Sequence, residues 1–221
     1  GQSMTAMWYY CTQPDGPGVS LYNRYDNNGD KPTTPGFQDD DSLGYRLSSV
    51  VWNDMDWNSL SRKISEGFVG QSAENTWRMF AYSMQLTGEP QMTEIWSTQG
   101  GHAMVVYRVV NGTLYIADPN YPGNSDRKIE YSDGIFKVYN SGASAEEIAK
   151  GNGIAFDRIT YVAKTALSDW GKISSRWQEL KNKTIGNDKF PDYQIIWTDS
   201  KNQDHSLKDG YISPIDLINI A

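Results

Sequence analysis

Apolar residues recur at helical spacing in several stretches of the chain. The spacing predicts a helix over 2–10, a short helix over 57–66, a third over 72–87 and a fourth over 170–180. The apolar positions that carry the three longer helices are Met4, Met7 and Trp8, then Trp77, Phe80, Ala81 and Met84, and finally Trp170, Ile173, Trp177 and Leu180. We expect these side chains to face a protein core.

Strand patterns fill the middle of the chain. Residues 101–110 are rich in β-branched and aromatic side chains, and Asn111-Gly112 is a hairpin turn sequence. Residues 113–117 return as a second strand that ends at Asp118. Shorter strands are predicted over 127–131, 135–139, 193–197 and 211–220, and a capping box over 144–147 predicts one more short helix.

These elements indicate an α+β fold with antiparallel strands. A chain of 221 residues suits one large domain, or a domain with a small appendage. Because the pattern changes to short strands and turns beyond Gly186, we expect one domain over 1–185. Residues 186–221 would then be a β extension or the start of a small β module.

His102 leads the first strand of the hairpin and Asp118 ends the second, so the turn decides whether they share a face. A two-residue loop at Asn111-Gly112 would turn them to opposite faces of the sheet. A three-residue loop over 110–112, with Gly112 in the left-handed position of a bulge, would make them diagonal neighbours on one face. Backbones of diagonal neighbours are about 7–8 Å apart, which these side chains can bridge. The carboxylate would then fix the tautomer of the imidazole and stabilise its charged form.

Composition narrows the classes of function. The net charge is −7 and the 20 Lys and Arg are scattered, which argues against a nucleic-acid partner. The single cysteine, Cys11, excludes a disulfide framework and a cysteine-based zinc site, and two histidines exclude a histidine-rich metal cluster. No stretch reaches the roughly 18 apolar residues of a membrane-spanning helix. Eight Trp and 14 Tyr among many Asn, Asp, Gly and Ser suit a secreted bacterial protein, so an extracellular or cell-surface location is expected.

Two polar segments have ordinary explanations. An acidic loop is predicted over 23–44, where Asp and Asn oxygens could hold calcium, but the spacing and closing glutamate of an EF-hand are absent. A solvated acidic loop is therefore the favoured interpretation. His205, in the polar loop 200–206, is expected to be a solvated surface residue.

Three short motifs occur together: Gly1-Gln2-Ser3-Met4-Thr5-Ala6 at the start of the chain, Gly101-His102-Ala103 at the start of a strand, and Asp118 sixteen residues after the histidine. This arrangement resembles the papain-like cysteine peptidases of bacteria, in particular the staphopain type. Asp118-Pro119-Asn120 is also similar to the closing motif of C39-like bacterial peptidases. The resemblance covers roughly residues 1–140.

The resemblance implies a papain-like fold, in which an N-terminal helix packs on an antiparallel sheet. It also implies thiol-dependent hydrolysis of a protein or peptide substrate, without a metal or an organic cofactor. His102 would protonate the leaving amine and Asp118 would orient His102. Backbone N–H groups near the helix start would hold the oxyanion, with Gly1, Gln2 and Gly101 as the oxyanion and cleft residues.

The nucleophile of this family would lie two positions before Gly1. Three explanations are open: the chain is truncated or cleaved just after the nucleophile, Ser3 replaces it, or Cys11 is the nucleophile. Cys11 follows the predicted helix, where the helix dipole disfavours a thiolate, and a free cysteine is typically buried. We therefore expect Cys11 to be a buried thiol at the far end of that helix.

Two other classes of function remain open. The domain would be a catalytically inactive peptide- or glycan-binding surface module if it lacks a nucleophile. It would be a transglutaminase-like acyl transferase if the same Cys-His-Asp chemistry served a different acceptor.

Overall fold

The computed structural model describes most of the chain, and the sequence divides into two compact units, Gly1–Ile185 and Gly186–Ala221. The described residues are 1–13, 42–121, 123–142, 150–167, 169–182, 184–189, 195–206 and 217–220. The predicted acidic loop up to residue 41 and the capping box at 144–147 lie outside them. Residues 42–44, which were predicted to be loop, instead begin a helix.

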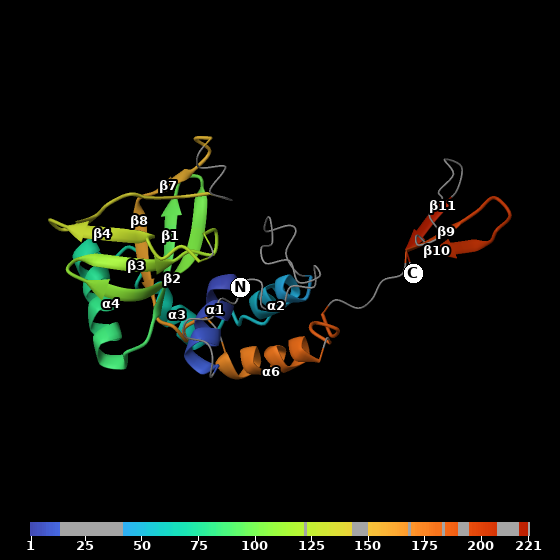
Figure 1. Cartoon of the computed structure of the whole chain (residues 1–221), viewed down its shortest axis with the longest axis horizontal. Coiled ribbons are helices and arrows are strands. Elements are labelled where there is room, and N and C mark those ends of the chain that lie inside the picture. The colour runs from blue at the N-terminus through green and yellow to red at the C-terminus, as the bar shows by residue number, and fades with distance from the viewer. Residues whose placement is uncertain are drawn as a thin grey trace. The chain divides into compact units, whose positions relative to one another are not determined.

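The first unit is a mixed α+β structure with an antiparallel, nearly barrel-shaped sheet (Figure 1). Its described helices are α1 (Gln2–Thr12), α2 (Ser42–Asn53), α3 (Leu60–Glu66), α4 (Ala73–Thr87) and α6 (Trp170–Lys181). Its described strands are β1 (Gln91–Ser97), β2 (Gly100–Val110), β3 (Thr113–Ala117), β4 (Lys128–Ser132), β5 (Ile135–Phe136), β6 (Tyr139–Ser141), β7 (Ile154–Phe156) and β8 (Arg158–Val162).

The caps of α4 explain why this helix was predictable. Ser72 is its N-cap and its hydroxyl accepts a hydrogen bond from the backbone N–H of Asn75. Gly88 closes the helix in the left-handed conformation, with φ of 67°, and its N–H binds the carbonyl of Met84. Between these caps Phe80 is fully buried, as its helical spacing predicts.

The six-stranded sheet has the order β5-β4-β3-β2-β1-β8, and β6 and β7 form a separate two-stranded ribbon. One apolar core fills the space between this sheet, the ribbon and α4. Its fully buried members include Phe80, Ile95, Met104, Val106, Leu114 and Ile116. His102 lies on the same face of β2 as Met104 and Val106, so the core side of the sheet carries the candidate histidine.

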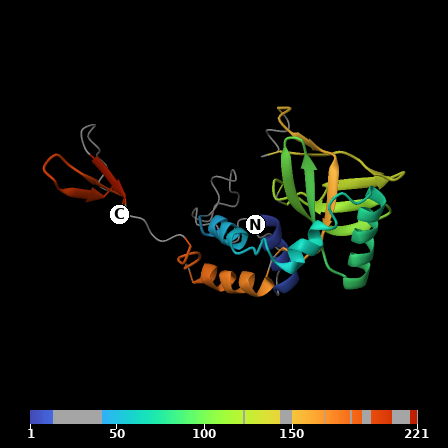
Figure 2. The same cartoon turned by 180° about the vertical axis from the view of Figure 1, so that it is seen from behind.

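The other helices pack on one another beside the sheet. Figures 1 and 2 show α1, α2 and α6 together, with α4 set apart from them against the sheet. Trp177 of α6 packs against Trp8 and Tyr9 of α1, with ring centroids 5.7 and 5.3 Å apart. Arg176 of α6 also forms a bidentate ion pair with Asp54, which follows α2. These contacts fix α1 relative to its neighbours, and α1 in turn touches β2.

The second unit contains a three-stranded antiparallel sheet of order β10-β9-β11, formed by β9 (Ile195–Thr198), β10 (Asp204–Ser206) and β11 (Leu217–Ile220). His205 lies in β10 rather than in a loop. Its Nε2 is 3.1 Å from Oδ2 of Asp199, and its side chain is about one-third exposed. The predicted loop is therefore a strand at this residue, and the histidine side chain is partly exposed.

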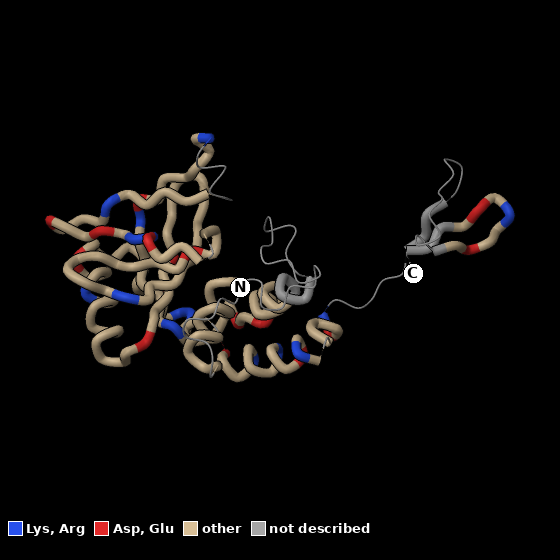
Figure 3. Tube along the Cα trace, viewed as in Figure 1, with Lys and Arg blue, Asp and Glu red and all other residues tan. Residues whose placement is uncertain are grey.

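Charged side chains are dispersed over the first unit. Figure 3 shows Lys and Arg interspersed with Asp and Glu along its helices and strands. None of the described helices is both long enough and apolar enough to cross a membrane.

Candidate functional site

The β2–β3 hairpin carries the candidate site. The strand pairing near His102 is set by a bulge in β2 and not by the turn that the sequence predicted. The turn is a two-residue loop, with φ of 47° at Asn111 and 78° at Gly112, and Val110 pairs with Thr113. A bulge at Tyr107 then shifts the register by one residue, so that Val105 pairs with Ala117. The predicted three-residue loop is therefore wrong. The strand register that such a loop would give at His102 is nevertheless present, because the bulge adds one residue to β2.

His102 and Asp118 meet across this hairpin. Nε2 of His102 is 2.7 Å from Oδ1 of Asp118, which is a hydrogen bond, and the two side chains lie on one face as predicted. The Asp118 side chain is completely buried, whereas that of His102 keeps 16% of its surface exposed. The imidazole therefore borders solvent on one side and a buried carboxylate on the other.

The buried carboxylate of Asp118 accepts four hydrogen bonds. Oδ1 accepts from His102 Nε2 and from the backbone N–H of Asn120, at 2.7 and 2.9 Å. Oδ2 accepts from the hydroxyls of Tyr139 and Ser141, at 2.7 and 3.0 Å. Such a set of donors stabilises an ionised carboxylate in a buried position.

The charge state of Asp118 follows from these contacts. Burial by itself raises the pKa of this carboxyl. The hydrogen bond and charge of His102, with the donors of Tyr139 and Asn120, outweigh burial and hold the pKa of Asp118 below its usual range. Asp118 is therefore an acceptor only, and the hydrogen on Nε2 of His102 points at it.

Arg127 contacts Tyr139, one of the donors to Asp118. Its Nε donates to the hydroxyl oxygen of Tyr139 at 2.8 Å, and its guanidinium stacks on the rings of Tyr121 and Tyr139, 4.1 and 4.4 Å from their centroids. Burial and the charge of Asp118 raise the pKa of Tyr139 far above its usual value. Tyr139 is therefore a neutral donor at every physiological pH.

The first turn of α1 lies against the histidine strand. The hydroxyl of Ser3 donates to the carbonyl of Ala103 at 2.7 Å, one residue beyond His102. β3 pairs with β2 only as far as Val105, so Ala103 lies beyond that pairing. Gly1 packs on α2 so closely that a Cβ atom would come 2.2 Å from the carbonyl oxygen of Ser48. The start of α1 is thus bound to the histidine strand by one hydrogen bond and packed on α2 by one close backbone contact.

The predicted oxyanion and cleft residues occupy two places. Gly1 and Gln2 form the start of α1, which has no side-chain cap, so its first N–H groups lack partners within the helix. Gly101 precedes His102, and a Cβ there would come 2.6 Å from the indole ring of Trp96. A glycine at this position therefore accommodates Trp96, a role that the sequence did not indicate.

Cys11 differs from its prediction. It lies in the last turn of α1, as expected, but its side chain is exposed rather than buried. Partial desolvation raises the pKa of the Cys11 thiol, with Lys164 opposing and Glu89 adding to this shift. Because it follows Ser3 by eight residues, it lies about 12 Å further along the helix axis. Its position does not favour it as a partner of His102.

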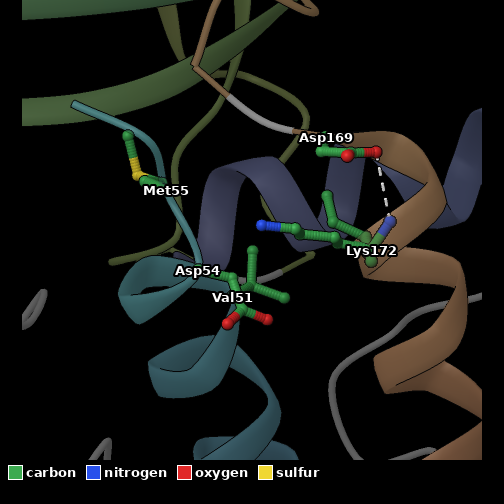
Figure 4. A pocket seen from close by; sticks show the side chains of 6 residues that line it. Val51, Asp54, Met55, Asp169 and Lys172 are labelled. Carbon is green, nitrogen blue, oxygen red and sulfur yellow. Dashed lines mark hydrogen bonds between the residues drawn. The ribbon is translucent and has the colours of Figure 1, made fainter. Parts of the chain in front are cut away.

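A small pocket lies elsewhere in the first unit (Figure 4). It lies between the end of α2 and the start of α6, and it is lined by Val51, Asp54, Met55, Asp169, Lys172 and Ile173. Both of its carboxylates are already engaged: Asp54 binds Arg176, and Asp169 caps α6 by accepting from the N–H groups of Gly171 and Lys172. Asp54 therefore joins the end of α2 to α6, and Asp169 stabilises the start of α6.

Sequence reasoning missed part of the site. Tyr139, Ser141 and Arg127 all contact or support Asp118, yet they lie in other strands and turns, 9 to 23 residues away. Alternation in β6, where Tyr139 and Ser141 are buried and Asn140 is exposed, is the one signal that could have indicated them. No group of three or more His, Cys, Asp and Glu side chains in the described part of the chain is placed to hold a metal ion.

No protein-family model, curated protein or solved structure matches this chain. The chemistry of the site therefore rests on its own geometry.

Proposed function

We propose that the first unit is the catalytic domain of a thiol-dependent amide hydrolase with a papain-like fold, of the kind that the motifs resemble. The observation that carries the proposal is the 2.7 Å contact between His102 and Asp118, beside a helix start that Ser3 ties to the same strand. The nucleophile would be a cysteine two positions before Gly1. Its substrate would be a protein or a peptide, at the cell surface or outside the cell.

The two ring nitrogens of His102 would have different tasks. Nε2 donates to the ionised Asp118, which leaves Nδ1 as the nitrogen that can take up a proton. Nδ1 would accept the proton of the cysteine thiol, and the sulfur would attack the carbonyl carbon of the substrate. His102 would then return the proton to the leaving amine as the C–N bond breaks, and water would hydrolyse the thioester.

The start of α1 supports the position of the nucleophile. The helix dipole and the unpaired first N–H groups stabilise negative charge, both on a thiolate and on the oxyanion of a tetrahedral intermediate. Gly1 and Gln2 would supply these N–H groups. A residue two positions before Gly1 lies within about 7 Å of extended chain from Gly1.

The proposal is tested with the chain extended upstream of Gly1 to include this cysteine. We expect the extended chain to cleave members of a fluorogenic peptide library, and we expect the chain that starts at Gly1 to be inactive. His102→Ala should lower kcat by at least about 10²–10⁴-fold, the usual contribution of general acid–base catalysis. Asp118→Ala should lower it less, because Asp118 acts through the imidazole.

The other histidine provides the matched control. His205 also contacts a carboxylate, but it lies in the second unit. His205→Ala should leave kcat unchanged. Equal losses from His102→Ala and His205→Ala, or activity of the short chain that survives a thiol alkylator, would contradict the proposal.

One observation favours a second candidate, a peptide- or glycan-binding module. Trp52 and Trp57 are 51% and 43% exposed, and their rings contact each other edge to face, with centroids 5.0 Å apart. Exposed aromatic rings of this kind are common in binding surfaces. An extended chain that cleaves no peptide and transfers no acyl group to an added amine, but binds a peptide or glycan array through these rings, would support this candidate.

A further inference from the structure

We propose that Tyr139, backed by Arg127, is the positioning residue that locks Asp118 in place and thereby assigns the proton-accepting role to Nδ1 of His102. The inference deepens the proposed function and rests on it for its catalytic consequence. Its structural part, the locking of Asp118, stands on the contacts alone.

Arg127, Tyr139 and Asp118 form a row of hydrogen bonds, and the chemistry of each group fixes which one donates. The guanidinium of Arg127 can only donate, so the oxygen of Tyr139 accepts from it. The ionised Asp118 can only accept, so the hydroxyl proton of Tyr139 must point at Oδ2. Arg127 therefore donates to Tyr139, and Tyr139 donates to Asp118.

The same logic extends to the histidine. Oδ1 of Asp118 is left to accept from Asn120 and from His102. Nε2 of His102 must then carry its hydrogen, and the neutral ring must keep Nδ1 unprotonated. If Asp118 turned about its terminal bond, Nε2 would lose this acceptor and both tautomers would become accessible.

Tyr139 is the donor best placed to prevent that rotation. Its hydroxyl is closer to Oδ2 than that of Ser141, at 2.7 against 3.0 Å, and its ring is anchored in the core with 4% of its surface exposed. Arg127 restricts it further by stacking on the ring while donating to the oxygen. Ser141 is also buried, but its hydroxyl is farther from Oδ2 and receives only the long hydrogen bond of the neutral Asn120 amide, so it is expected to contribute less.

The test uses Tyr139→Phe, which removes only the hydroxyl. Tyr161→Phe is the matched control, because Tyr161 is a buried member of the same core whose hydroxyl binds Gln91 instead. The chain has two histidines, so the His102 ring signals in ¹⁵N-detected NMR spectra can be assigned with a His205→Gln variant. Two quantities are read: the tautomer of the neutral ring from its ¹⁵N shifts, and the rate of exchange of the Nε2 hydrogen with water.

In the wild-type chain and in Tyr161→Phe, we expect the Nε2–H tautomer and slow exchange. In Tyr139→Phe, we expect a mixture of tautomers and exchange that is faster by about tenfold or more, the scale of one lost hydrogen bond to a charged group. Arg127→Gln should shift both quantities in the same direction by a smaller factor. Unchanged spectra in Tyr139→Phe, or an equal change in Tyr161→Phe, would overturn the inference.

The catalytic consequence is measured separately in the extended chain. Tyr139→Phe should lower kcat by about tenfold with little change in KM, since it disturbs a proton transfer rather than substrate binding. If the NMR spectra change as expected but the extended chain hydrolyses no peptide, the role of Tyr139 in holding Asp118 is supported and the proposed function is refuted. An active enzyme whose kcat is insensitive to Tyr139→Phe would refute the positioning role alone.

Discussion

Asp118 is the residue on which the candidate site depends. It was recognised in the sequence by its distance from His102, but its environment was not, because three of its supporting side chains come from later segments. Burial of a carboxylate is unfavourable by itself, and four donors offset that cost. Asp118 therefore joins the end of β3 to β6 and to the imidazole of His102 through buried hydrogen bonds.

Acid should destabilise the fold through Asp118. Its pKa is lowered in the folded protein, so its carboxylate contributes stability that is fully present above the unfolded value of about 4 and is lost as pH falls through the folded value. At neutral pH, Asp118→Asn should lower the free energy of unfolding by about 2 kcal/mol or more. Urea unfolding monitored by tryptophan fluorescence across a pH series measures this difference.

The difference in unfolding free energy between wild type and Asp118→Asn should become smaller as pH falls below about 4. Asp126→Asn, which replaces an exposed aspartate of the same sheet region, is the control and should cost little at any pH. A gap for Asp118→Asn that stays constant from neutral to acid pH would contradict the proposed charge state.

At the scale of elements, the sequence predicts best where one local signal determines the structure. The location of the hairpin turn at Asn111-Gly112, though not its loop length, and the capped helix α4 are examples. β1 and β8 were not predicted. Their buried residues are consecutive, at 91–93 in β1 and 159–162 in β8, so burial does not follow the alternation of a half-exposed strand. The bulge at Tyr107 has no local signal either, since tyrosine suits a regular strand equally well. The prediction that His102 and Asp118 share one face of the hairpin is therefore correct, although the loop length on which it was based is wrong.

Two asparagine/aspartate–glycine turns allow a matched test of the hairpin. Gly112 has φ of 78° and a Cβ there would come 2.5 Å from the carbonyl oxygen of Tyr131, whereas Gly134 has φ of 82° and open space around it. Both substitutions to alanine incur the cost of the left-handed conformation, about 1 kcal/mol. Gly112→Ala must also displace the β4 backbone, so it should lower the unfolding free energy by at least about 1 kcal/mol more than Gly134→Ala. Equal effects in urea unfolding would show that the hairpin and β4 are not packed as described.

At the scale of the whole molecule, the candidate site lies where the helices and the sheet meet within Gly1–Ile185. The β2–β3 hairpin carries His102 and Asp118. The start of α1 is bound to β2 through Ser3 and packs on α2 at Gly1. The nucleophile proposed upstream of Gly1 would lie at this end of α1, whereas Cys11 lies at the opposite end of the helix.

The most direct test of this account is the rate at which each cysteine of the extended chain reacts with iodoacetamide, measured by peptide mass spectrometry at neutral pH. The cysteine proposed two positions before Gly1 should react at least about tenfold faster than Cys11. In the proposed site His102 and the helix start would favour its thiolate, whereas partial desolvation raises the pKa of Cys11. His102→Ala should slow the first cysteine and leave Cys11 unchanged. Preferential labelling of Cys11, or an upstream cysteine whose rate does not depend on His102, would contradict the account.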